Sequence, residues 1–121
     1  MMKYNLVAIG EAMAELRQES DAGWAVGFAG DTFNTAIYCA RALEPGTVGF
    51  VTRVGEDPLS EGFRELASAE GVVTDEIIAD ADRNIGLYSV KTDAAGERSF
   101  HYWRSASAAR KMFDQVDTTE V

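Results

Sequence analysis

Two tyrosines and an arginine, at positions 88, 102 and 104, are the side chains in this sequence best suited to bind an oxygen-rich anion. An arginine binds a carboxylate through two parallel hydrogen bonds, and tyrosine hydroxyls pair with the hydroxyls of a polyol. Because side chains alternate along a strand, Tyr102 and Arg104 share a face if they lie on one strand. The alternative is an ordinary two-faced hairpin with a solvated arginine.

The segment that carries these residues has the sequence pattern of a β-hairpin. Strands are predicted over 85–92 and 98–104, and Gly96 in the DAAGE loop supplies the positive φ that a short hairpin loop needs. The resulting register places Tyr88 directly opposite Tyr102. Gly86 then lies opposite the arginine and leaves open space beside the guanidinium.

A second candidate lies in AGDTFNTAIYCARAL, at 29–43. Asn34 is a poor helix former placed one turn inside a helix predicted over 32–43. Gly30 allows a close approach of the backbone, and the amide hydrogens at a helix start face outward beside Asp31. These features suit a hydroxyl-rich ligand. The alternative is an Asn34 amide that is solvent-facing or bonded locally.

Other polar residues have simpler interpretations. Asp57 is predicted to cap a helix that begins at Pro58. Glu11 follows the first strand and belongs either to the crevice at the strand end or to a solvated turn. The lone His101 has no Cys or His partner at metal-ligand spacing, so neither a zinc site nor a serine–histidine triad is expected.

Composition predicts one modest domain with a real core: the chain has 121 residues, of which 46% are hydrophobic. A net charge of −9 argues against nucleic acid as a partner. No apolar run is long enough to span a membrane, and the N-terminus lacks a signal-peptide pattern. With the single Cys39, these features predict a cytoplasmic protein without disulfides.

The expected fold class is α/β: a parallel sheet flanked by helices, interrupted by strand pairs that project from it and hold a ligand. There is no dinucleotide-binding G-x-G-x-x-G turn and no phosphate-binding G-x-x-x-x-G-K-[ST] loop. The predicted elements, in chain order, are strands 4–9, 12–18 and 24–28, a helix over 32–43, a strand over 47–54, a helix over 58–70, strands 85–92 and 98–104, and a helix from Ser105 or Ser107 to Phe113.

The sequence resembles the ribokinase-like (PfkB) carbohydrate kinases, and most closely their 2-keto-3-deoxygluconate kinase branch. The resemblance rests on four stretches in the family's order: IGEAMAEL at 9–16, GFAGDTFNTAIYCARAL at 27–43, VTRVGEDPLSEGF at 51–63 and GLYSVKTDAAGERSFHYWRSASAA at 86–109. A Tyr-Trp-Arg followed by Ser-Ala-Ala marks the keto-deoxy-sugar branch. The family's G-G-x-x-x-N starts here with Ala29 instead of glycine, which removes no hydrogen-bond donor.

The resemblance implies an ATP-dependent kinase that phosphorylates a sugar acid, with Asn34 on the sugar hydroxyls and a lid over them. It implies the same substrate-binding residues that their types suggest: Gly30, Asp31, Asn34, Tyr88, Tyr102 and Arg104. The projecting strands, about 12–28 and 85–104, would form the lid. Because lids in this family often pair between subunits, a homodimer through the lid strands is expected.

The largest departure from the family concerns catalysis. The family's Gly-Ala-Gly-Asp segment, which supplies the general base and an anion hole, does not occur in these residues, and neither do its ATP-binding loops. Residues 1–121 therefore match the N-terminal part of one kinase domain, with the C-terminal ATP-binding half absent. ATP and Mg²⁺ are expected in the complete enzyme and neither is expected to bind this portion alone. No catalytic residue is assigned.

Three hypotheses remain open from the sequence. The first is the sugar-binding and lid portion of a kinase for 2-keto-3-deoxygluconate. The second is a catalytically inactive module that binds a sugar or dimerises. The third is a ribokinase-like kinase for another sugar, such as fructose or a nucleoside, against which Tyr102-Trp103-Arg104 argues because a neutral sugar needs no arginine there.

Overall fold

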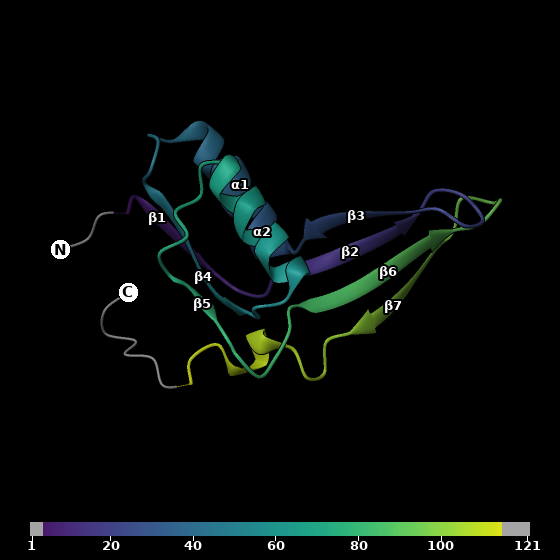
Figure 1. The fold of residues 1–121 in the computed structure, drawn as a ribbon. Coiled ribbons are helices and arrows are strands. Elements are labelled where there is room, and N and C mark those ends of the chain that lie inside the picture. The colour runs from purple at the N-terminus through teal and green to yellow at the C-terminus, as the bar shows by residue number, and fades with distance from the viewer. Residues whose placement is uncertain (1–3, 115–121) are drawn as a thin grey trace.

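Two parts make up the structure, a computed structural model that describes residues 4–114: a body of sheet and helices, and an arm of strands that projects from it (Figure 1). Among the described residues neither α-helix is long and apolar enough to cross a membrane. In chain order the elements are β1 (Leu6–Ile9), β2 (Met13–Gln18), β3 (Trp24–Ala29), α1 (Asp31–Ala42), β4 (Val48–Val54), α2 (Pro58–Ala69), β5 (Ile77–Ala79), β6 (Gly86–Thr92), β7 (Arg98–Trp103) and the 3₁₀ helix η1 (Ala108–Lys111).

The body is a parallel three-stranded sheet, in the order β1-β4-β5, with α1 and α2 on the same face (Figure 1). Its middle strand, VGFVTRV, is apolar along most of its length, as expected of a strand covered on both sides. The core is built on Phe33, Phe50 and Phe63, all fully buried, with ring centroids 4.8 to 6.2 Å apart. This core holds the start of α1 against β4, the middle strand of the sheet.

The arm is one four-stranded sheet in the order β3-β2-β6-β7, which we call the lid sheet. The pairs β2–β3 and β6–β7 are antiparallel, as the sequence predicts. The pairing that joins them, β2 with β6, is parallel and was not predicted. The two projecting strand pairs therefore form a single surface, and one face of that surface is turned toward the start of α1.

Local turn chemistry follows the sequence closely. Asp57 accepts a hydrogen bond from the Ser60 amide at 3.0 Å, and Pro58 is the first residue of α2, so the predicted helix start is confirmed. Gly96 in the β6–β7 loop has φ 84°, also as predicted. These two turns fix where α2 begins and which residues of β6 and β7 pair.

Two segments differ from the sequence prediction. The predicted last helix is only a short 3₁₀ helix, η1, and the Ser107 hydroxyl does not cap it. That hydroxyl donates instead to the Glu11 carboxylate at 2.9 Å, because the segment after β7 folds back onto the end of β1. Strand β5, at the sheet edge, was not predicted, and its three residues are too few for a periodic signal.

Candidate functional site

A pocket of about 430 Å³ opens where α1 begins, between the segment after β1 and the inner face of the lid sheet. All six residues that the sequence singled out for sugar binding line it: Gly30, Asp31, Asn34, Tyr88, Tyr102 and Arg104. They come from three separate parts of the chain. The fold therefore brings together residues that the sequence could only associate by type.

Gly30 makes the close approach on which the pocket depends. It has φ 142°, and a Cβ at this position would lie 2.5 Å from the carbonyl oxygen of Glu11. Any other residue would push the start of α1 away from the segment after β1. The glycine thereby sets the position of Asp31, the first residue of the helix, and of Asn34 one turn later.

The Asn34 side chain is exposed to the pocket and makes no hydrogen bond with the residues described in the structure. Its backbone amide continues the helix by donating to the Gly30 carbonyl at 2.8 Å. The interpretation that the Asn34 side chain is hydrogen-bonded locally is therefore excluded within residues 4–114. The amide group keeps its donors and acceptor for solvent or for a ligand.

Tyr88 lies opposite Tyr102 in the β6–β7 pair, as the predicted register requires. Their ring centroids are 5.7 Å apart, and Tyr88 is buried whereas Tyr102 is half exposed. The Tyr88 hydroxyl donates to the Glu15 carboxylate. Burial, and next this hydrogen bond, raise the pKa of Tyr88 well above its usual value. The phenol therefore stays protonated, and its oxygen remains available to accept a bond from a ligand hydroxyl.

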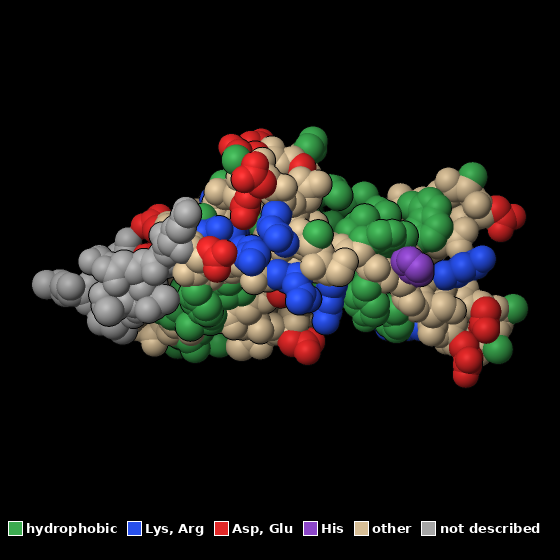
Figure 2. Space-filling model, turned by 90° about the horizontal axis from the view of Figure 1, so that it is seen from below, with side chains coloured by type: hydrophobic (Ala, Val, Ile, Leu, Met, Phe, Trp, Pro, Cys, Tyr) green, Lys and Arg blue, Asp and Glu red, His purple; other side chains and the backbone are tan. Residues whose placement is uncertain are grey.

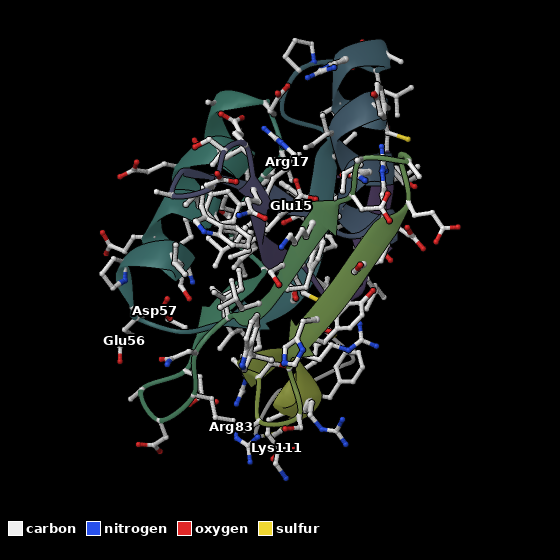
Figure 3. All side chains as sticks on the ribbon, turned by 90° about the vertical axis from the view of Figure 1, so that its right-hand side faces the viewer. Glu15, Arg17, Glu56, Asp57, Arg83 and Lys111 are labelled. Atoms are coloured by element: carbon white, nitrogen blue, oxygen red, sulfur yellow. The ribbon has the colours of Figure 1, made fainter. Side chains whose placement is uncertain are left out.

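Glu15 is a residue of this network that the sequence analysis missed. It lies on β2 directly beside Tyr88 on β6, and Arg17 donates to its second carboxylate oxygen at 3.2 Å (Figure 3). Alternation along MAELRQ puts Glu15 and Arg17 on one face, which is visible in the sequence. The parallel pairing of β2 with β6 is not, and only that pairing brings Glu15 to the tyrosine.

Arg104 lies with its guanidinium carbon 5.2 Å from the centre of the Tyr102 ring, and its side chain is 51% exposed. The prediction of open space beside the Arg104 guanidinium is wrong. A Cβ on Gly86 would meet Glu11 Oε2 at 2.7 Å and Arg104 Cβ at 3.3 Å, because long side chains from neighbouring segments fill that space. Arg104 also contacts the sulfur of Met13, with Nη1 3.8 Å from Sδ.

Glu11 lies in the crevice and is not a solvated turn residue. Its carboxylate lines the pocket, is hydrogen-bonded to Ser107, and lies 4.0 Å from Arg104 Nη1. The pocket lining thus carries one cation, Arg104, with two carboxylates, Glu11 and Asp31. Such a lining offers several hydrogen-bond acceptors for sugar hydroxyls and one cation, Arg104, that can pair with a carboxylate.

The described residues form two larger hollows, and one of them adjoins the site. One, of about 600 Å³, lies on the other side of Tyr102 and Arg104, which line both it and the pocket. The other, of about 540 Å³, is near basic side chains that gather on the underside where the arm meets the body (Figure 2). There Arg53 already pairs with Asp80 at 3.4 Å and with the Asp114 carbonyl at 2.6 Å. None of the six predicted residues lines this second hollow.

Two ligand-binding patterns do not occur here. Within residues 4–114 no group of three His, Cys, Asp or Glu side chains is arranged to hold a metal ion. The chain also lacks a phosphate-binding G-x-x-x-x-G-K-[ST] loop.

Comparison with known proteins places these features in a family. The pfkB family of carbohydrate kinases matches residues 3–120. The 2-dehydro-3-deoxygluconokinase of Dickeya dadantii is 41% identical over 100% of this chain and 39% of its own length. This chain thus spans about two fifths of that curated relative.

Solved structures agree on the fold. A PfkB protein from Polaromonas sp. JS666 superposes with a TM-score of 0.84 at 24% identity, over 97% of this chain and 41% of that one. A fructokinase from Vibrio cholerae O395 gives 0.78 at 25% identity, over 86% and 35%. The chain therefore has the ribokinase-like fold and belongs to the pfkB family of carbohydrate kinases.

Proposed function

We propose that this chain is the sugar-binding and lid portion of a cytoplasmic, ATP-dependent kinase that phosphorylates 2-keto-3-deoxygluconate. The observation that carries the proposal is the convergence of the six residues on one pocket, in which Arg104 is the only lining cation among residues 4–114. Arg104 and Tyr102 hold the acid end of the sugar, and Asn34 and Tyr88 orient the polyol end. Gly30 and Asp31 complete the wall at the helix start.

In the complete enzyme, on this proposal, a hydroxyl of the sugar acid attacks the γ-phosphorus of ATP, its proton passes to the general base, and ADP leaves. Phosphoryl transfer depends on positioning and on charge stabilisation. The residues of this chain contribute the positioning: they bind the sugar, orient it and shield it beneath the lid sheet. We propose that the general base, ATP and Mg²⁺ belong to the part of the relatives that this chain does not span.

Calorimetric titration tests the choice of substrate. The 121-residue chain should bind 2-keto-3-deoxygluconate more tightly than fructose. Arg104→Ala should weaken binding of the acid about tenfold to a hundredfold, because a charge-assisted pair is lost, and should leave fructose binding nearly unchanged. Arg98→Ala is the matched control, because Arg98 begins β7 whereas Arg104 directly follows its other end. A preference for fructose in the unaltered chain contradicts the acid-sugar proposal.

Fructose is the second candidate because Glu11 and Asp31 outnumber the single lining cation. A neutral ketose meets no repulsion from these carboxylates and can donate hydroxyl bonds to them. The similarity to the Vibrio cholerae fructokinase fold is compatible with this alternative. The same titration separates the two, since only an acid ligand depends on Arg104.

Catalysis is tested by reading the encoding DNA beyond the codon for Val121. A reading frame that continues to a Gly-Ala-Gly-Asp segment supports a working kinase. In that longer protein, Arg104→Ala should weaken binding of the sugar acid far more than binding of ATP. A stop codon directly after Val121 favours the remaining alternative, an inactive module that binds sugar or dimerises.

We also propose that the chain forms a homodimer through its lid strands. The outer face of the lid sheet carries Trp24, Val26 and Trp103, each about half exposed, on the arm whose apolar surface is visible in Figure 2. Burying such residues against a second lid stabilises a pair of subunits. Sedimentation at high concentration should show a dimer that Trp103→Ser weakens. A well-behaved monomer contradicts the proposal.

A further inference from the structure

Glu11 is the one carboxylate within ion-pair distance of Arg104 among residues 4–114. Its Oε1 lies 4.0 Å from Nη1, which is close enough for the charges to interact but too far for a hydrogen bond. The guanidinium donors are therefore not used by Glu11. The negative charge of Glu11 nevertheless repels an anion that approaches Arg104.

Glu11 is also held in place. Its other oxygen, Oε2, accepts the hydrogen bond from Ser107, a residue that is 4% exposed. The same oxygen lies against the bare Cα of Gly86, where any Cβ would come within 2.7 Å. An incoming ligand cannot easily push this carboxylate aside, so the negative charge stays beside Arg104 when the pocket fills.

We propose that Glu11 is a specificity-determining residue, the resident counter-ion of Arg104 that limits how tightly the pocket binds an acid. The inference rests on the proposed function, because it assumes that Arg104 receives the carboxylate of the sugar. A ligand carboxylate must bind the guanidinium donors on the side away from Glu11, and like charges at this range oppose it. A neutral sugar meets no such opposition.

Asp31, the other carboxylate that lines the pocket, does not have this role. It begins α1 and makes no ion pair with Arg104. The position of Glu11, between Ser107 and the guanidinium, also fixes the direction of an acid ligand. The acid end lies over Tyr102, and the hydroxyls extend toward Asn34.

The decisive variant is Glu11→Gln, which removes the charge and keeps an amide that can still pair with Ser107. Calorimetry on the 121-residue chain should show 2-keto-3-deoxygluconate binding about threefold to fivefold more tightly, the range expected for one partly exposed charge interaction. Fructose affinity should not rise, because a neutral sugar meets no repulsion from the Glu11 carboxylate. Glu56→Gln, at an exposed position away from the pocket, removes the same charge and should alter neither affinity (Figure 3).

A ligand-free measurement separates this inference from the proposed function. The Nε–Hε signal of Arg104 in NMR spectra should shift in Glu11→Gln and stay in place in Glu56→Gln. An unshifted signal, or weaker binding of the acid by Glu11→Gln, overturns the role of Glu11. If the unaltered chain binds no acid sugar, the proposed function fails, and the NMR comparison still decides whether Glu11 is the counter-ion of Arg104.

Discussion

The body and the lid sheet are stabilised in different ways. In the body, three phenylalanines are fully buried between the sheet and its helices. In the lid sheet, every residue of β7 is exposed, and Phe100, Tyr102 and Trp103 are about half exposed. The body therefore has a core of its own, whereas the lid sheet is a single layer. Its base packs on that core through Ala14 and Phe28, and the rest depends on strand pairing, on ring contacts and on a few polar contacts.

Those polar contacts are the same ones that shape the pocket. The Tyr88–Glu15 bond joins the two halves of the lid sheet, and the Ser107–Glu11 bond ties the end of β7 to the body. A thin lid held this way can adjust over a ligand without disturbing the body. The comparison predicts that equal substitutions should have unequal effects in the two regions.

The largest difference is expected for phenylalanine. Phe50→Ala removes a fully buried ring from the body and should lower the free energy of unfolding by about 3–5 kcal/mol. Phe100→Ala removes the same ring from the lid sheet, where it is 51% exposed, and should cost about 1 kcal/mol or less. Urea unfolding of both variants measures the difference. Equal losses would mean that the lid sheet has a core of its own.

Glycine gives a second test at the boundary of the two regions. Gly30→Ala should destabilise the chain by about 2–4 kcal/mol, because the new Cβ meets the Glu11 carbonyl in a strained conformation. Gly96→Ala, at the tip of the lid sheet, also has positive φ but has nothing within 4 Å and should cost about 1 kcal/mol. Thermal unfolding compares the two. A Gly96 variant as unstable as the Gly30 variant would contradict the contact argument.

A smaller effect is expected at the start of α2. Asp57→Ala removes the cap on the Ser60 amide and should cost about 1 kcal/mol of unfolding free energy, because one helix donor loses its partner. Asp57→Asn keeps an acceptor and should recover part of the loss. Chemical denaturation of the three proteins gives the order, and identical stabilities would rule out a capping contribution.

The pH dependence of the same carboxyl is the weakest of these tests. Burial raises the pKa of Asp57, but hydrogen bonds from Ser60 and the backbone outweigh it and leave the pKa below the ordinary value of 3.8. Its contribution is therefore complete above pH 3.8 and is lost as the pH falls through the lower, folded-state pKa. The stability gap to Asp57→Asn should shrink as the pH falls from about 4 to 2. A gap that widens contradicts this sign.

The sequence predicted most elements because their signals are local. Asp57 with Pro58 starts a helix, and Gly96 with its flanking strands sets a hairpin register, through contacts between near neighbours. The parallel pairing of β2 with β6 has no such signal. Alternation along a strand shows which residues share a face, but not which distant strand lies beside it.

The same difference between local signals and long-range pairing applies to the site. The types of Asn34, Tyr102 and Arg104 indicated their chemistry, and the fold brings them to one pocket. Glu15 escaped notice because it depends on the unpredicted pairing. The prediction of open space beside Gly86 was wrong because strand register does not show which side chains enter from other segments. Here the Glu11 side chain fills that space.

The contacts that close the pocket also have a consequence for how the chain folds. Tyr88 and Glu15 are 73 residues apart in sequence, and Ser107 and Glu11 are 96 apart. Loops of this length must close before either contact forms, and folding slows as such distant contacts dominate a structure. On the ribosome, β2 therefore has to wait until β6 has been made, because Met13 of β2 pairs with Gly86 of β6. The sheet and helices of the body should form first, and the sugar-binding pocket should form only after β6 and β7 have paired with the earlier strands.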